Sequence, residues 1–174
     1  SSNDFASYKK HFADDCLLFA TFSSSETGSL THQRFTKTDI VGAGRLPVGK
    51  PKEGIEILLW DERGREVRDG EAGEIMVRSR YLSPGYWRND ALTAAQFSTS
   101  PDGARLYRTG DLGSRKSDGS LMFMGRRDNQ VKVNGYRVEL SEIEDAITRQ
   151  SEIESAIVVA RTLPDHNVQL SAYV

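Results

Sequence analysis

Short runs of strand character, each followed by a turn signal, fill most of the first two thirds of the sequence. Turn signals such as Asp61–Gly64 and Asp118–Gly119 separate these runs. One brief helix is predicted over Asp90–Phe97, where several alanines favour helix. The pattern as a whole predicts a small antiparallel sheet or a distorted barrel. The runs that we expect to form its strands are Leu17–Phe22, Ile55–Trp60, Glu74–Ser79 and Ser120–Met124.

The pattern changes after Asp128. The dipeptide Asn134-Gly135 lies between two alternating runs and tolerates the positive φ angles of a tight turn, which predicts a β-hairpin. Ser141 precedes Glu144 by three residues, the spacing of a capping box, so we expect a helix over residues 142–149. Two further strands are predicted over Ser155–Ala160 and Val168–Val174.

These elements together predict the α+β fold class. A distorted antiparallel β-barrel-like subdomain is expected to precede the start of a small α+β C-terminal subdomain. The charged segment Gly125–Asn129 lacks apolar periodicity, so we place the boundary there, with residues 1–127 before it and residues 128–174 after it. Because the sequence begins at Ser1 and stops at Val174 inside an alternating pattern, we expect both ends to be cut.

Composition and charge narrow the classes of function. The formal net charge is −2 and no dense basic block is present, which argues against nucleic acid as the main partner. The longest apolar runs, such as Cys16–Ala20, are far shorter than the ~20 residues that a membrane-spanning helix needs. The single cysteine excludes an intramolecular disulfide, and the N-terminus has no signal-peptide pattern, so we expect a cytoplasmic location.

Two polar segments and a group of aromatic residues invite a functional interpretation. Asp111 follows a glycine in Tyr107–Leu112, where its carboxylate could accept two hydrogen bonds from a vicinal diol such as a ribose or could cap a turn. The segment Phe22–Thr27 holds three serines before a glutamate and fits a polar loop equally well. The aromatic residues at positions 81, 86 and 87 are expected to pack in the core.

Three longer segments resemble successive core motifs of the adenylation domains of nonribosomal peptide synthetases, which belong to the adenylate-forming superfamily. The segments are Gly73–Trp87, Tyr107–Leu112 and Gly125–Glu144, and they occur in the order found in that family. Phe22–Thr27 resembles a fourth motif, an aromatic-Gly-x-Thr-Glu segment, with Ser23 in place of glycine and Ser25 in place of threonine. The similarity extends from about His11 to Val174 and implies the C-terminal half of such a domain.

The resemblance implies roles at the nucleotide. Glu26 would act in catalysis by holding Mg²⁺ against the phosphates of ATP, and the Ser25 hydroxyl would donate to the α-phosphate. The resemblance also assigns nucleotide-binding roles to four residues: Phe22 at the adenine, Asp111 and Arg126 at the ribose hydroxyls, and Phe123 where the family often has a tyrosine.

The same resemblance implies a substrate pocket, a hinge and partners. Thr21, Ser29 and Leu30 would line the pocket for the substrate side chain, and Asp128 would be the hinge between the end of the large adenylation core and the mobile C-terminal subdomain. The implied partners are an amino acid or another small carboxylic acid, a peptidyl carrier protein with its phosphopantetheine thiol, and a condensation domain.

Three interpretations stay open on the sequence. The first is a piece of an ATP-dependent ligase that forms an aminoacyl-AMP; since the phosphate-binding loop would precede Ser1 and the late catalytic lysine would follow Val174, we expect the 174-residue chain alone to be inactive. The second is a fatty-acyl or aryl-acid AMP ligase of a polyketide or lipid pathway. The third is a non-catalytic interaction module derived from an adenylation domain.

Overall fold

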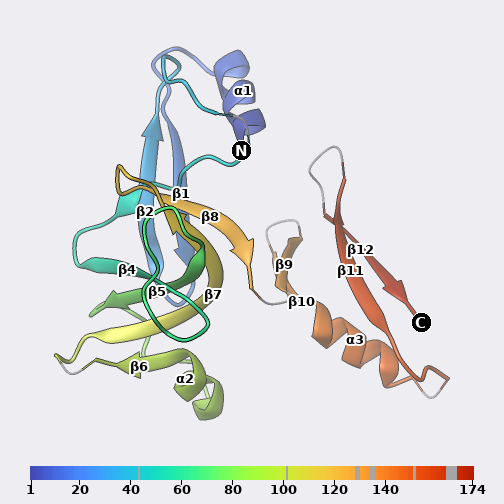
Figure 1. Cartoon of the computed structure of the whole chain (residues 1–174). Coiled ribbons are helices and arrows are strands. Elements are labelled where there is room, and N and C mark those ends of the chain that lie inside the picture. The colour runs from blue at the N-terminus through green and yellow to red at the C-terminus, as the bar shows by residue number, and fades with distance from the viewer. Residues whose placement is uncertain (43, 101, 128–129, 134–135, 151, 164–167) are drawn as a thin grey trace. The chain divides into compact units, whose positions relative to one another are not determined.

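The computed structural model describes residues 1–42, 44–100, 102–127, 130–133, 136–150, 152–163 and 168–174. The chain separates into two compact units, Ser1–Gly125 and Arg126–Val174. Figure 1 shows the order of the elements along the chain. The predicted α+β class with a curled antiparallel sheet is confirmed. The predicted hinge residue Asp128 lies outside the described residues, and the boundary between residues 127 and 128 stays a prediction.

The described residues of the first unit form two antiparallel sheets and two helices. Helix α1 spans Ser2–His11, and the first sheet contains β1 (Leu18–Ser24), β2 (Gly28–Phe35) and β3 (Lys50–Pro51) in that order. The second sheet has the order β4-β5-β7-β6, and β8 also pairs with β7. Its elements are β4 (Ile55–Trp60), β5 (Gly73–Ser79), β6 (Phe97–Thr99), β7 (Arg105–Arg115) and β8 (Leu121–Arg126), with helix α2 (Asp90–Gln96) leading directly into β6.

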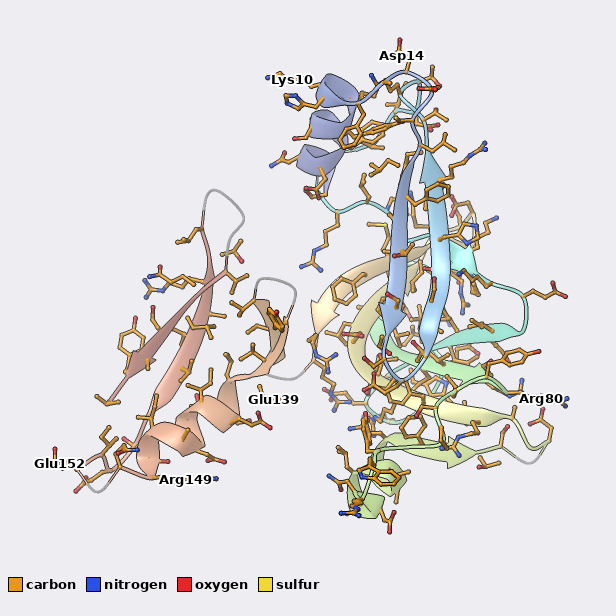
Figure 2. The ribbon with its side chains drawn as sticks, turned by 180° about the vertical axis from the view of Figure 1, so that it is seen from behind. Lys10, Asp14, Arg80, Glu139, Arg149 and Glu152 are labelled. Atoms are coloured by element: carbon orange, nitrogen blue, oxygen red, sulfur yellow. The ribbon has the colours of Figure 1, made fainter. Side chains whose placement is uncertain are left out.

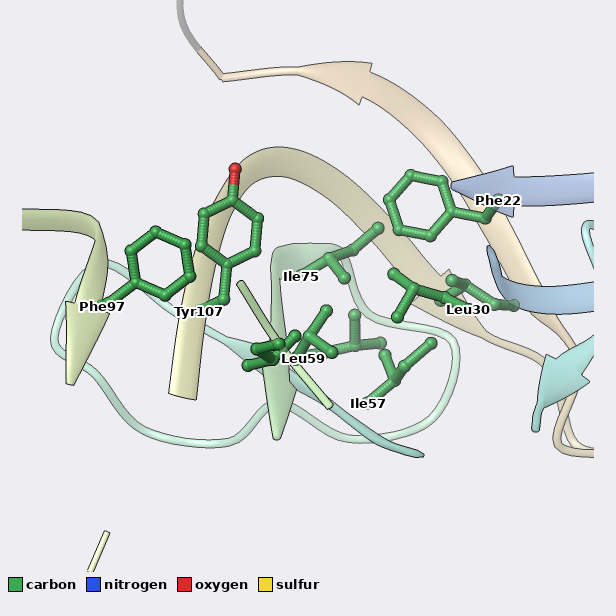
Figure 3. Packing of buried hydrophobic residues seen from close by; sticks show 10 residues of the cluster. Phe22, Leu30, Ile57, Leu59, Ile75, Phe97 and Tyr107 are labelled. Atoms are coloured by element: carbon green, nitrogen blue, oxygen red, sulfur yellow. The ribbon is translucent and has the colours of Figure 1, made fainter. Parts of the chain in front are cut away.

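The main core lies between the two sheets. Phe22 and Leu30 from the first sheet pack against Leu59, Ile75 and Tyr107 from the second, as Figure 3 shows. Ile57 and Leu59 of β4 lie on one face, as do Ile75 and Val77 of β5, because successive residues of a strand point to opposite sides. Burial of each such side chain contributes about 1.5–3 kcal/mol, which makes this cluster the main source of stability for the first unit.

A smaller core beneath α1 was not predicted. Ser1 caps the helix through a capping box with Asp4, and the buried rings of Phe5 and Tyr8 pack with Phe35 of β2. The Ser-x-x-Asp spacing and the apolar pair three residues apart were signals for this helix in the sequence. Figure 2 shows Lys10 at the end of α1 and Asp14 in the turn after it.

The second unit contains two hairpins and a helix. Strands β9 (Gln130–Val133) and β10 (Tyr136–Glu139) pair antiparallel, as do β11 (Ile157–Thr162) and β12 (Val168–Tyr173). The predicted hairpin around residues 134–135 is confirmed by the pairing of its strands, while these two residues themselves lie outside the described ones. Helix α3 spans Leu140–Thr148, and Figure 2 labels Glu139 and Arg149 at its two ends.

The predicted capping box of α3 is wrong. The helix begins at Leu140 with Glu139 as its N-cap residue, so Ser141 already lies in the first turn. Glu144 instead accepts a hydrogen bond at Oε1 from the backbone N–H of Val158 in β11, 2.8 Å away. The carboxylate of Glu144, which the local spacing assigned to the helix cap, therefore binds a residue that is distant in the sequence.

Candidate nucleotide site

The turn between β1 and β2 carries the first candidate residues. Ser24 and Gly28 pair across the hairpin, and the hydroxyl oxygens of Ser24 and Thr27 lie 2.9 Å apart. Between them Ser25 is exposed and Glu26 is half-buried. The hairpin thus presents the two residues predicted to act at the phosphates side by side at its tip.

Hydroxyl groups surround the carboxylate of Glu26. Tyr86 donates to its Oε1 atom over 2.9 Å. Burial alone raises the pKa of Glu26, but hydrogen bonds from its own backbone N–H and from Tyr86, Tyr107 and Ser24 outweigh burial and lower the pKa below its ordinary value. Glu26 is therefore an anionic carboxylate at neutral pH.

Tyr107 links this carboxylate to the core. Its ring is fully buried in the apolar cluster, and Figure 3 shows its hydroxyl oxygen pointing out of that cluster. Burial raises the pKa of the Tyr107 phenol, and the hydrogen bond with Tyr86 and the negative charge of Glu26 raise it further. The phenol therefore stays protonated and can act as a donor at neutral pH.

Asp111 lies in the middle of β7 beside a β-bulge. The register between β5 and β7 shifts so that Ile75 faces the three residues 109–111, and Gly110 adopts φ 72°, which favours glycine. The buried Thr109 hydroxyl donates to the Ile75 carbonyl over 2.8 Å and accepts from the backbone N–H of Asp111 over 2.9 Å. The bulge thereby fixes the backbone at Asp111, whose side chain retains little exposure.

Phe22 and Phe123, the two aromatic residues predicted near the nucleotide, lie together. Their ring centroids are 5.9 Å apart and their planes meet at 32°. Arg45 covers the Phe123 ring at 5.4 Å and donates to the Phe123 carbonyl over 3.1 Å. Phe22 is buried in the main core, and the partly buried Phe123 packs against that core. The adenine-binding role of both residues stays a prediction.

The three residues predicted for a substrate pocket do not share one environment. Leu30 is 1% exposed and belongs to the main core, whereas Thr21 and Ser29 are exposed. Lys52 donates to the Ser29 hydroxyl over 2.8 Å. The structure therefore separates Leu30 from the two polar residues, and the pocket role of all three stays a prediction.

Serine in place of glycine at position 23 causes no strain. Ser23 lies in β1, and among the described residues other than glycine only Arg88 has a positive φ angle. A side chain is therefore compatible with the backbone at this position. Arg126, the predicted partner of Asp111 at the ribose, is the last residue of β8 and the first of the second unit, and its role stays a prediction.

The three aromatic residues expected in the core behave differently. Tyr86 is partly buried and packs against the main core, which confirms the prediction for that residue. Tyr81 and Trp87 are 80% and 87% exposed, so the prediction is wrong for both. The loop between β5 and α2 explains this difference, because consecutive residues outside a strand or helix follow no fixed inward pattern.

The residues around Glu26 fit a magnesium ion bound together with a nucleotide. Among the described residues no group of three or more His, Cys, Asp or Glu side chains could enclose an ion. Mg²⁺ commonly binds through one or two carboxylates and the phosphates of its nucleotide, retaining several waters. The anionic carboxylate of Glu26 at the hairpin tip provides an oxygen ligand of this kind, and the exposed Ser25 precedes it in the chain.

Comparison with known proteins places these observations in a family context. A model of the family described as AMP-binding enzyme matches residues 2–87. Bacitracin synthase 3 of Bacillus licheniformis is 42% identical over 135 residues, which cover 76% of this chain and 2% of that protein. D-alanine–D-alanyl carrier protein ligase of Lactiplantibacillus plantarum is 36% identical over 171 residues, covering 97% of this chain and 33% of the ligase.

Solved structures show the same similarity. PA1221, described as an NRPS protein containing adenylation and PCP domains, superposes with a TM-score of 0.79 at 33% identity, over 95% of this chain and 34% of that one. The chain spans a third or less of the length of the bacitracin synthase and of the D-alanine ligase. The described residues include no helix that is long and apolar enough to span a bilayer.

Proposed function

We propose, from the premise that this chain belongs to the AMP-binding family of adenylate-forming enzymes, that it provides nucleotide-binding residues for an ATP-dependent ligase. The ligase would join a carboxylic acid to AMP. In this reaction a carboxylate oxygen of the substrate attacks the α-phosphorus of ATP. The bond from the α-phosphorus to the bridging oxygen breaks, and pyrophosphate leaves with that oxygen.

The observation that carries this proposal is the position of two acidic residues, one at a hairpin tip and one at a strand bulge, in one unit. Glu26 is anionic and half-buried at a hairpin tip, while Asp111 is nearly buried at a bulge. The Tyr107 hydroxyl interacts with Glu26, and Tyr107 precedes Asp111 by four residues along β7, with the bulge between them. Strand β7 therefore carries both Asp111, the residue proposed for the ribose, and Tyr107, whose hydroxyl interacts with Glu26, the residue proposed for the phosphates.

Each residue has a defined task in the proposal. Asp111 accepts hydrogen bonds from the ribose hydroxyls, and Ser25 donates to the α-phosphate. Glu26 holds Mg²⁺, which offsets the phosphate charge when it is bound with ATP. Positioning of the nucleotide and compensation of its charge are the contributions of these side chains to the rate.

We infer that the substrate is an amino acid and that the product is passed to a carrier protein. Two of the relatives support this: one is a D-alanine–D-alanyl carrier protein ligase, and another contains adenylation and PCP domains. Transfer would join the acyl carbon to the phosphopantetheine thiol of the carrier with release of AMP. A condensation domain is the further partner expected in a peptide synthetase.

Substrate-dependent ATP–pyrophosphate exchange in the full-length protein tests the proposal. A panel of amino acids, fatty acids and aryl acids is compared, with Asp111→Ala as the inactive reference. Exchange that requires an amino acid supports the proposal. Exchange with only a fatty acid or an aryl acid would show that the protein is an acyl or aryl ligase. If the protein binds no nucleotide, it is a non-catalytic module.

A further inference from the structure

A segment far from Glu26 in the sequence contacts it twice. The Tyr86 hydroxyl donates to the Oε1 atom of Glu26 over 2.9 Å, and the backbone N–H of Ser83 donates to the backbone carbonyl of Glu26 over 2.9 Å. The segment Ser83–Tyr86 therefore fixes both the backbone and the side chain of the glutamate. A carboxylate on a three-bond side chain has many rotamers, and such a pair of contacts selects among them.

The segment that makes these contacts is itself held in place. The Ser83 hydroxyl donates to the Gly85 carbonyl and accepts from the Gly85 backbone N–H, at 3.0 and 3.2 Å. The backbone N–H of Tyr86 donates to the Thr93 hydroxyl in α2 over 2.9 Å. Gly85 has φ 141°, and a Cβ atom there would lie 2.4 Å from the Thr93 methyl group, so only glycine allows this approach.

Aromatic contacts fix the Tyr86 ring. It meets Phe97 edge to face with 5.7 Å between ring centroids, and Phe97 packs on Tyr107 at 4.7 Å. The hydroxyl oxygens of Tyr86 and Tyr107 are 3.5 Å apart. The backbone hydrogen bond to Thr93 and the packing against Phe97 thus hold the Tyr86 ring in place, and its hydroxyl donates to the carboxylate of Glu26.

We propose that Tyr86 is a positioning residue that orients the Glu26 carboxylate for a divalent cation bound with the nucleotide. This inference rests on the proposed function, in which Glu26 holds that cation. Hydrogen bonds to a ligating carboxylate orient it, and their loss typically weakens metal affinity about 10- to 100-fold. Tyr86 acts through Glu26 and not through contact with the substrate.

The test is the substitution Tyr86→Phe in the full-length protein, which removes one oxygen atom and keeps the ring. Binding of Mn²⁺ in the presence of a non-hydrolysable ATP analogue is measured by electron paramagnetic resonance. We expect the dissociation constant of Mn²⁺ to rise about tenfold or more. The metal-free affinity for AMP and the melting temperature should change little, which separates orientation of the carboxylate from a general loss of structure.

Two comparisons make the test specific. Tyr81→Phe removes the hydroxyl of an exposed tyrosine five residues away and should leave Mn²⁺ binding unchanged. In a Glu26→Gln background, Tyr86→Phe should cause no further loss, because residues that act through one another are not additive.

If the wild type binds Mn²⁺ with the nucleotide and Tyr86→Phe binds it equally well, the inference about Tyr86 is wrong while the proposed function stands. An equal loss with and without Glu26 also overturns it, since Tyr86 would then act elsewhere. A wild-type protein without metal-dependent nucleotide affinity overturns the proposed function and this inference together.

Discussion

At the scale of single residues, we propose Asp111 as the side chain on which nucleotide recognition depends. Substitution by Asn keeps its shape and removes its charge. Hydrogen bonds to charged groups are worth about 1.5–3 kcal/mol, so the affinity for AMP should fall about 10- to 100-fold. Isothermal titration of the full-length protein measures this loss. Asp118→Asn, in the exposed turn before β8, is the matched control; equal affinities in the two variants would remove Asp111 from the site.

The ion pair between Arg108 and Glu74 is a second residue-scale feature and concerns stability. Glu74 retains 6% of its side-chain exposure, whereas Arg108 retains 47%. Their atoms meet at 2.8–3.1 Å through two guanidinium nitrogens. Arg108→Met leaves a buried carboxylate without this partner, while Glu74→Gln leaves an arginine that water can reach.

We therefore expect Arg108→Met to lower the free energy of unfolding by about 1–3 kcal/mol and Glu74→Gln to lower it by less. Urea denaturation of both variants provides the comparison. A larger loss of unfolding free energy in Glu74→Gln than in Arg108→Met would contradict the view that Glu74 is the buried partner that depends on the ion pair.

At the scale of elements, the bulge in β7 depends on one hydroxyl group. Thr109→Val keeps the shape of the side chain and removes the contacts to Ile75 and to the Asp111 backbone. Loss of a buried donor and acceptor should destabilise the protein by about 1–3 kcal/mol and weaken AMP binding as well. Thr99→Val at the exposed end of β6 should change neither quantity. Thermal unfolding and titration with AMP together check this. An unchanged AMP affinity in Thr109→Val would show that the bulge does not contribute to nucleotide binding.

Elements governed by local signals could be predicted from the sequence. The strand over Ile55–Trp60 and the helix starting at Asp90 are confirmed, because alternation and alanine content act within the segment itself. Strands β2 and β7 were missed, since polar residues such as Thr109 lie at buried positions that only their neighbours satisfy. The capping box at Ser141 failed for the same reason: Val158, a distant residue, uses Glu144.

In the candidate site, too, local motifs could be found in the sequence, whereas contacts between distant residues could not. Motifs read along the chain located Glu26 and Asp111, whose proposed roles need only their residue type and order. The support that Tyr86 and Tyr107 give to Glu26 crosses sixty or more residues. No local spacing contains that information, although both tyrosines lie inside the motifs that the sequence singled out.

At the scale of the whole molecule, the first unit holds its own hydrophobic cores. The main cluster and the cluster beneath α1 draw all their members from residues 1–125. A polypeptide of residues 1–125 is therefore expected to unfold cooperatively. Trp60 lies in it and is partly buried, so its fluorescence reports the transition, whereas Trp87 is already exposed in the folded unit. A gradual, non-cooperative change would show that this unit does not fold by itself.

A crystal structure of the full-length protein with AMP tests the central claim most directly. We predict that the ribose hydroxyls lie within hydrogen-bonding distance of the Asp111 carboxylate, with the phosphate on the side of Glu26. An AMP molecule bound with its ribose away from Asp111, or with its phosphate remote from the β1–β2 turn, would contradict this claim.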